Sequence, residues 1–229
     1  MDVTPVDSAQ HSALIHKAVW LRAVVFDLLF PPRCAGCGRV GTAWCATCTR
    51  ALDTLPIESR ERRVEDVLVI ASGAHVGLLQ EAVQGLKYHG LRGLAEPLGT
   101  RVADAVSRLG HTFDAVVAVP SPPHRLRMRG YNQAQLIADV TARHLGASRL
   151  NDALTRTRET RSQVGLTSAE RRENVSGAFI AHADRVRGLR ILIVDDVCTT
   201  GATLAACAGA LHEGGAHHVM AATVTEATR

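Results

Sequence analysis

Two neighbouring carboxylates, Asp195 and Asp196, stand between an apolar run and a short hydroxyl-rich loop. The run 191–194 has the composition of a buried parallel strand, and a helical pattern begins at Leu204, after the loop. Open α/β sheets bind ligands at the carboxyl ends of their strands, and helix N-termini attract anions. Carboxylates accept hydrogen bonds from vicinal hydroxyl groups, while main-chain N–H groups and threonine hydroxyls hold a phosphate. This order predicts a sugar-phosphate site made by the acidic pair with Thr199, Thr200, Gly201, Ala202 and Thr203.

An ordinary buried strand followed by a capped helix is the other interpretation of this run. It is disfavoured because two charges at the end of a strand are costly without a ligand or partner. The common nucleotide-binding patterns, G-x-x-x-x-G-K-[ST] and a strand-linked G-x-G-x-x-G, do not occur in the chain.

Four further candidate ligands are cysteines in two C-x-x-C pairs, Cys34 with Cys37 and Cys45 with Cys48. Two such turns, seven residues apart, can supply the four sulfur atoms of a closed tetrahedral zinc shell, which is structural rather than catalytic. Disulfides, a redox pair and an iron–sulfur site are the alternatives. Zinc is favoured in a cytoplasmic protein, where disulfides are rare.

The stretch 191–203 closely resembles the 5-phosphoribosyl-1-pyrophosphate (PRPP) binding motif of type I phosphoribosyltransferases. The resemblance implies that Asp195 and Asp196 hold the ribose hydroxyls as the catalytic pair and that the loop 199–203 holds the 5′-phosphate. It also implies that a loop after the apolar run 115–119 binds pyrophosphate with Mg²⁺, through Ser121, Arg125, Arg127 and Arg129. Pro122 and Pro123 would stiffen that loop. A proline-ended strand with a basic turn is the alternative.

The segments 129–134, 158–163 and 171–179, together with residues 86–88 and the four cysteines, are similar to the ComF family. That family joins a zinc motif to a phosphoribosyltransferase-like domain and is associated with DNA uptake and natural competence. Three functions follow from the resemblance: Mg²⁺-dependent phosphoribosyl transfer from PRPP, or another ribose 5-phosphate, to an unknown acceptor; binding of single-stranded DNA within the competence machinery; and sugar-phosphate sensing without catalysis. A mobile lid would comprise Arg156, Arg158, Arg161 and Gln163. Phosphoribosyltransferases commonly form dimers, so the resemblance also allows a homodimer.

The charge of the chain is uneven. The net charge is +4, but residues 124–172 contain ten arginines against four acids. This concentration favours a polyanionic partner, pyrophosphate or nucleic acid, over a merely solvated surface. The apolar stretch 18–30 is interrupted by Arg22 and Asp27 and is too short to span a bilayer, so we expect a cytoplasmic protein without membrane insertion.

The elements that must position these residues alternate between strand and helix. Strands are expected at 67–72, 115–119, 191–194 and 218–224, and helices at 78–86, 94–109, 132–145, 167–173 and 202–213. Alternation of this kind predicts an α/β fold in which a parallel sheet is flanked by helices. We expect a small zinc-binding head over residues 1–62, including an N-terminal helix, and a phosphoribosyltransferase-like domain over residues 63–229. The charged stretch 58–66 is predicted to be the linker between them.

Overall fold

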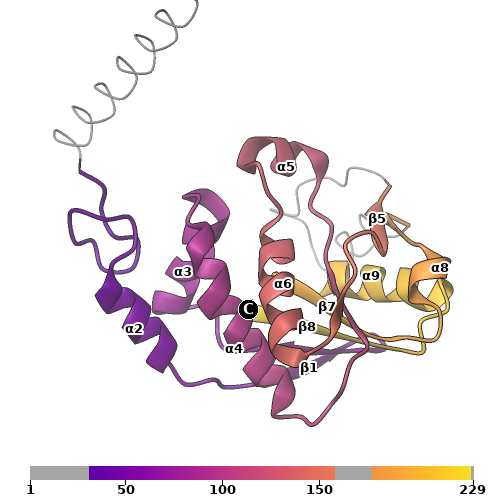
Figure 1. Ribbon diagram of the computed structural model, residues 1–229. Helices are drawn as coiled ribbons and strands as arrows, with labels where there is room; N and C mark the ends of the chain where they lie inside the picture. Colours follow the sequence, from indigo (N-terminus) through magenta and orange to yellow (C-terminus); the bar gives the residue numbers. More distant parts are fainter. Residues whose placement is uncertain (1–30, 158–176, 228–229) are drawn as a thin grey trace, which may run out of the picture.

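The computed structural model describes residues 31–157 and 177–227. Its centre is a six-stranded sheet in the order β1-β2-β8-β7-β3-β4 (Figure 1). The edge strand β1 is antiparallel to β2, and the other neighbours are parallel. A separate antiparallel pair joins β5 to β6. The strands are Arg60–Val64 (β1), Val67–Ala71 (β2), Ala115–Ala118 (β3), Ser148–Arg149 (β4), Leu154–Arg156 (β5), Phe179–Ala181 (β6), Arg190–Cys198 (β7) and His218–Glu226 (β8).

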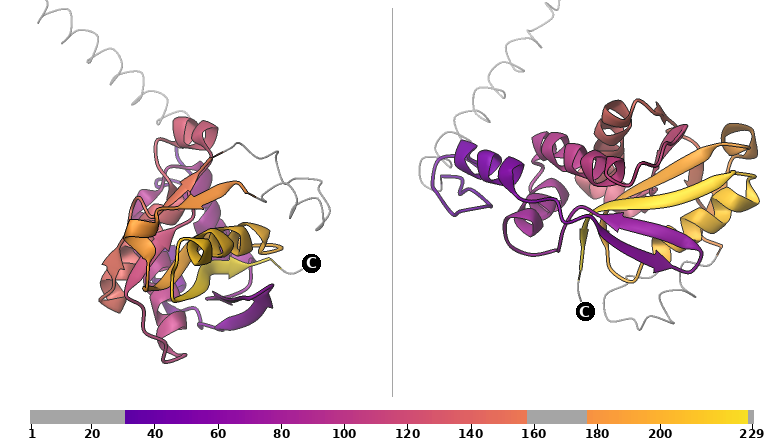
Figure 2. Two further views of the ribbon diagram at one scale, coloured as in Figure 1. Left: turned by 90° about the vertical axis from the view of Figure 1, so that its right-hand side faces the viewer. Right: turned by 90° about the horizontal axis from the view of Figure 1, so that it is seen from below.

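Helices cover both faces of the sheet. The right-hand view of Figure 2 shows α3, α4 and α6 on one face and α9 on the other. Within the described ranges, no helix combines the length and the apolar character that crossing a membrane requires. The helices are Ala46–Thr54 (α2), Gly77–Tyr88 (α3), Ala95–Ser107 (α4), Pro123–Arg129 (α5), Gln133–Leu145 (α6), Ala183–Val186 (α8) and Ala202–Glu213 (α9), with a 3-10 turn at Arg92–Leu94.

Strand β7 runs through the middle of the sheet and is apolar on both sides. Leu192 and Val194 belong to the core beneath α3, α4 and α6, whereas Ile191 and Ile193 belong to the core beneath α9. Successive side chains of a strand point to opposite faces. The same alternation, continued along the strand, places Asp196 on the α3 face and Asp195 on the α9 face.

The mostly parallel sheet flanked by helices confirms the predicted fold class. Helix α9 has the predicted bounds. Helix α6 begins one residue after its expected start, because Asn132 is its N-cap: the side chain of Asn132 accepts a hydrogen bond from the main-chain N–H of Ala134. The predicted linker is wrong: Arg60–Val64 forms β1, and the expected domain boundary at residue 62 lies inside this strand. Strand β7 continues past residue 194 to Cys198, because β8 pairs with it that far. The helices expected near the N-terminus and at 167–173 lie outside the described residues.

A buried arginine fixes α2 to the body of the sheet. Arg101, on α4, is 5% exposed, and its guanidinium donates to the carbonyl oxygens of Leu55 at 2.7 Å and Pro56 at 2.9 Å. Longer hydrogen bonds reach the carbonyl oxygens of Leu52 and Ser72. One guanidinium thus binds carbonyl oxygens that precede β1 in the sequence and one that follows β2. These hydrogen bonds hold the end of α2 close to the end of β2.

Candidate functional site

A cavity of about 500 Å³ lies at the carboxyl ends of the parallel strands. Its walls come from the segment after β3, the end of β7, the first turn of α9 and the residue after β8. This is the edge where open α/β sheets bind ligands. The predicted site residues that line it are Ser121, Arg125, Arg156, Asp195, Asp196, Thr199, Thr200, Gly201, Ala202 and Thr203.

The two carboxylates are held differently. Oδ1 of Asp195 accepts the main-chain N–H of Asp196 at 2.8 Å. Oδ1 of Asp196 lies 2.8 Å from Nζ of Lys87, which reaches over from α3. The second oxygen of Asp196, Oδ2, is buried and has no hydrogen-bond partner among the residues that the structure describes. An unpaired buried carboxylate oxygen is costly, and a hydroxyl donor in the cavity would satisfy it.

The electrostatics of the pair are set by burial and by Lys87. Burial, followed by the charge of Asp196, raises the pKa of Asp195 to about 7. Burial alone would lower the pKa of Lys87, but the neighbouring acidic groups, Asp196 first, together raise it. The site therefore contains an ion pair, Lys87 with Asp196, beside a second carboxyl group whose raised pKa lets it gain or lose a proton near neutral pH.

The predicted phosphate loop connects β7 to α9 and contains a left-handed turn at Gly201, with φ of +81°. A Cβ at this position would lie 2.6 Å from Cγ2 of Val64 on β1, so only glycine fits without a rearrangement. Because the first N–H groups of a helix have no acceptor within the helix, the first turn of α9 presents donors where the loop lines the cavity.

Strand β1 also holds the start of this loop. The guanidinium of Arg62 donates to the carbonyl oxygen of Thr199 at 2.9 Å and to Sγ of Cys198 at 3.0 Å, and it pairs with Glu226 at 3.1 Å. The sequence analysis missed Arg62, because the stretch that contains it was interpreted as a linker. The alternating exposure of β1 is the signal that identifies it as an edge strand.

The segment predicted to bind pyrophosphate is only partly a loop. The hydroxyl of Ser121 donates to Oδ1 of Asn132 at 2.8 Å, which fixes this side chain at the cavity wall. Pro123 does not stiffen a loop; it begins α5, where proline is tolerated because the N–H of the first helical residue is unpaired anyway.

Helix α5 separates the three arginines that the sequence analysis grouped. Arg125 lines the cavity, whereas Arg127 and Arg129 do not. Arg127 lies about half a turn from Arg125 and is exposed. The guanidinium of Arg129 donates to Oε1 of Gln133 at 2.7 Å and lies 5.0 Å from the ring centre of Tyr88. The helix therefore directs one of the three arginines to the cavity.

Among the predicted lid residues, Arg156 is described, and it lines the cavity from β5 with its guanidinium 5.1 Å from the ring centre of Phe179. Arg158, Arg161 and Gln163 lie outside the described residues. The sequence analysis assigned no role to three cavity residues on or near α3, which are His75, Lys87 and Tyr88.

The four cysteines form a second candidate site. Their sulfur atoms all lie within 4.8 Å of one another, and the pairs Cys34–Cys48 and Cys37–Cys45 are each 3.7 Å apart. Four ligands at about 2.3 Å from a tetrahedral zinc ion would be about 3.8 Å from each other. The main-chain N–H of Cys45 donates to Sγ of Cys34, and such bonds hold the pKa of that thiol at about 6 despite burial, which would raise it. The arrangement can hold a metal ion in a four-sulfur shell.

Comparison with known proteins agrees with this geometry. The model of the phosphoribosyl transferase domain family matches residues 133–228, a segment that includes the acidic pair and the predicted phosphate loop. Competence protein F of Haemophilus influenzae is 30% identical over 182 residues, which cover 76% of this chain and 75% of that protein. DNA utilization protein YhgH of Salmonella typhi is 39% identical over 103 residues, 45% of each chain. Competence protein ComFC of Bacillus subtilis is 28% identical over 163 residues, 67% of this chain and 63% of the relative.

The match to Competence protein F extends over most of both chains and includes residues far outside the phosphoribosyl transferase segment. The cysteine cluster and the sheet with its cavity are the two structural features that the sequence resemblance implied. The chain therefore belongs to the ComF family of competence-associated proteins with a phosphoribosyltransferase-like domain.

Proposed function

We propose that the cavity binds PRPP, or another ribose 5-phosphate, and transfers the phosphoribosyl group to an acceptor. One observation carries this proposal: two carboxylates and the N-terminus of α9 line the same cavity. Within residues 31–157 and 177–227, Oδ2 of Asp196 has no hydrogen-bond donor, and a ribose hydroxyl would supply one. Asp195 and Asp196 would hold the ribose hydroxyls. The loop 199–203 would hold the 5′-phosphate.

The part of the cavity wall that follows β3 suits a second anionic group. Ser121 and Arg125 line the cavity from this segment, and a hydroxyl and a guanidinium are suitable donors to pyrophosphate. Mg²⁺ prefers phosphate oxygens and water, so it would enter with the pyrophosphate and supply charge neutralisation. In the transfer, the bond from ribose C1 to the pyrophosphate oxygen breaks, and pyrophosphate leaves with the electron pair. The acceptor then forms the new bond to C1 and loses its proton to solvent.

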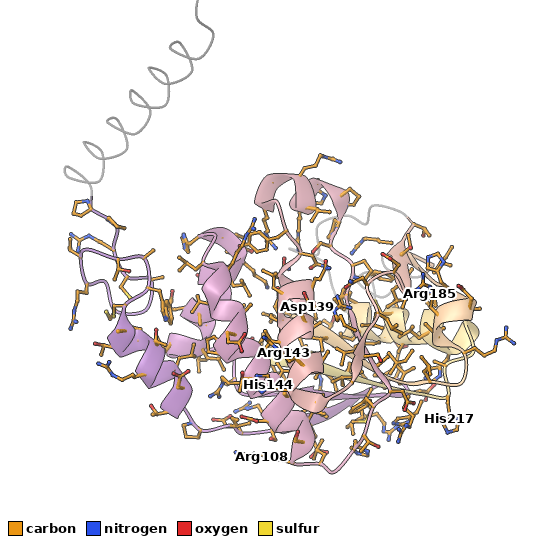
Figure 3. All side chains as sticks on the ribbon, in the orientation of Figure 1. Arg108, Asp139, Arg143, His144, Arg185 and His217 are labelled. Atoms are coloured by element: carbon orange, nitrogen blue, oxygen red, sulfur yellow. The ribbon has the colours of Figure 1, made fainter. Side chains whose placement is uncertain are left out.

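The test is calorimetric titration with PRPP and Mg²⁺. We expect saturable binding by the parent protein and its loss in the double variant Asp195→Asn/Asp196→Asn. Asp139→Asn is the matched control, because Asp139 lies on α6 (Figure 3), 47% exposed, and pairs with Arg149 outside the cavity. Binding of PRPP by the double variant at parental affinity would refute the site assignment.

Turnover distinguishes a transferase from a sensor. Release of pyrophosphate, followed by ³¹P NMR in the presence of candidate amines and bases, would establish transfer. Saturable binding without release by any acceptor would instead favour the alternative function, a sugar-phosphate sensor without catalysis.

Helix α5 favours a second candidate function, binding of single-stranded DNA beside the cavity. None of its residues is buried; Met128 is 79% exposed and Arg127 is exposed. The curated relatives carry competence and DNA-utilization names. Binding through arginine and phosphate contacts falls steeply with salt. Titration of labelled single strands across a salt series tests this function, and an Arg127→Gln variant with unchanged affinity and salt slope would argue against α5 as the contact.

For the cysteine cluster we propose one structural Zn²⁺, bound by Cys34, Cys37, Cys45 and Cys48 in a head that precedes β1. Four reduced thiols so close together suit a reducing compartment, which supports a cytoplasmic location. Elemental analysis should find one zinc per chain in the parent and less in Cys45→Ser. Unchanged zinc content in that variant would contradict the proposal.

A further inference from the structure

We propose that Lys87 is a positioning residue, which holds Asp196 by one carboxylate oxygen and leaves the other to a hydroxyl group of the bound ribose. This inference rests on the proposed function, because it requires a ribose phosphate in the cavity. It adds a residue from α3, outside the segment 133–228 that matches the phosphoribosyl transferase domain.

The contact is short and sheltered. Nζ of Lys87 lies 2.8 Å from Oδ1 of Asp196, and the two side chains are 18% and 5% exposed. Oδ2 of the same carboxylate is buried, and no group in the described part of the chain forms a hydrogen bond with it. A charged hydrogen bond on one oxygen restricts rotation of the carboxylate group, so the position of the second oxygen is also defined. Lys87 and Asp196 both line the cavity that would contain the ligand.

Position 87 has a lysine, whereas nearly all other basic residues of the chain are arginines. The chain has 24 arginines and two lysines, and Lys87 is the lysine that lies within the described residues. An arginine guanidinium is a planar fork that commonly binds both oxygens of a carboxylate. An ammonium group is a compact point charge that can bind one oxygen. A lysine is therefore the cation that pairs with Asp196 and keeps Oδ2 available.

The structure also keeps Lys87 in place. Helix α3 buries Leu79, Ala82, Val83 and Leu86 in the core, so its orientation on the sheet is fixed. At the end of the helix, the hydroxyl of Tyr131 donates to the carbonyl oxygen of Leu86, the residue before Lys87. The packed helix α3 therefore holds the ammonium group of Lys87 in a fixed position beside β7.

The experiment compares three ligands: inorganic phosphate, ribose 5-phosphate, and PRPP with Mg²⁺. Their affinities are measured by calorimetry for the parent, Lys87→Met, Asp196→Asn and the double variant Lys87→Met/Asp196→Asn. Arg143→Met is the matched control, because Arg143 (Figure 3) also forms a 2.8 Å ion pair, with Glu96, but is 63% exposed and outside the cavity.

If Lys87 acts through Asp196, Lys87→Met weakens ribose 5-phosphate and PRPP by the same factor, about tenfold or more, since a hydrogen bond to a charged group is lost. Affinity for inorganic phosphate, which has no ribose hydroxyl, stays within about twofold, as it does in the control. Adding Lys87→Met to Asp196→Asn causes no further loss, because the two residues act as one unit.

Three results would overturn the inference while leaving the proposed function intact. One is parental affinity of Lys87→Met for ribose 5-phosphate. Another is a loss confined to PRPP, which would make Lys87 a pyrophosphate ligand. The third is an additive loss in the double variant. If Lys87→Met does not fold, a further loss in the charge-balanced double variant relative to Asp196→Asn still overturns the inference. A parent protein that binds no ribose phosphate refutes the proposed function and the inference with it.

Discussion

Replacing Gly201 by alanine should destabilise the loop between β7 and α9 in two separable ways. The residue has φ of +81°, and a left-handed backbone costs a residue with a Cβ about 1–2 kcal/mol. The added Cβ would lie 2.6, 2.8 and 3.1 Å from Cγ2, Cγ1 and Cβ of Val64. Overpacking of this kind costs about 1–3 kcal/mol, so we expect the free energy of unfolding to fall by about 2–5 kcal/mol in total.

Urea unfolding measures this loss. With a denaturant slope near 2 kcal/mol/M, the midpoint should fall by about 1–2.5 M. The steric part alone is relieved by Val64→Ala, which removes the two nearest methyl groups. The double variant Gly201→Ala/Val64→Ala should therefore recover about 1–3 kcal/mol relative to Gly201→Ala, and the remainder reports the backbone cost.

The same substitution should reduce affinity for ribose 5-phosphate, because the main-chain N–H groups that follow Gly201 begin α9. A Gly201→Ala variant whose unfolding free energy stays within about 0.5 kcal/mol of the parent would refute the reasoning. So would a double variant that recovers nothing, since the clash with Val64 would then be absent.

Three other predictions concern stability and loop order. Arg101→Met should lower the free energy of unfolding by about 3 kcal/mol, because buried carbonyl groups lose a charged donor, and an unchanged urea midpoint would contradict this role. Arg62→Gln should weaken ribose 5-phosphate binding several-fold, because the carbonyl oxygen of Thr199 loses the hydrogen bond from the guanidinium. Parental affinity in calorimetry would show that this hydrogen bond is not needed to order the loop. Asp195→Asn should stabilise the protein more at pH 8 than at pH 5. The folded-state pKa of about 7 lies above the ordinary value, so this group's contribution is full below about pH 4 and is lost as pH rises through 7. The gain in the free energy of unfolding should differ by about 2 kcal/mol between the two pH values. Urea unfolding at each pH measures it, and equal gains would reject the raised pKa.

Local sequence signals predicted the loop and the helix after it well. The bounds of α9 follow from short-range features: an apolar strand before the loop, a glycine in it and a helical pattern after it. The four cysteines likewise come together as their spacing predicts, because both pairs lie within fifteen consecutive residues. In both cases, neighbours in the sequence decide the geometry.

Long-range contacts explain what the sequence analysis missed. Arg60–Val64 is rich in charge and was interpreted as a linker, but it pairs with β2 along five residues and forms a charged edge strand. Lys87 and Asp196 are more than a hundred positions apart, and no periodicity indicates that α3 places one beside the other. Pro123 was assigned to a stiff loop, although proline at the first position of a helix is equally regular.

The scarcity of lysine has a practical consequence. A lysine-specific protease can cleave the described part of the chain only after Lys87, whose side chain is 18% exposed and tied to Asp196. Cleavage at that bond requires the end of α3 to leave the sheet, and its rate under mild conditions follows the population of that opened state. Limited proteolysis thus provides a direct readout of local opening at the cavity, without a label or an engineered probe.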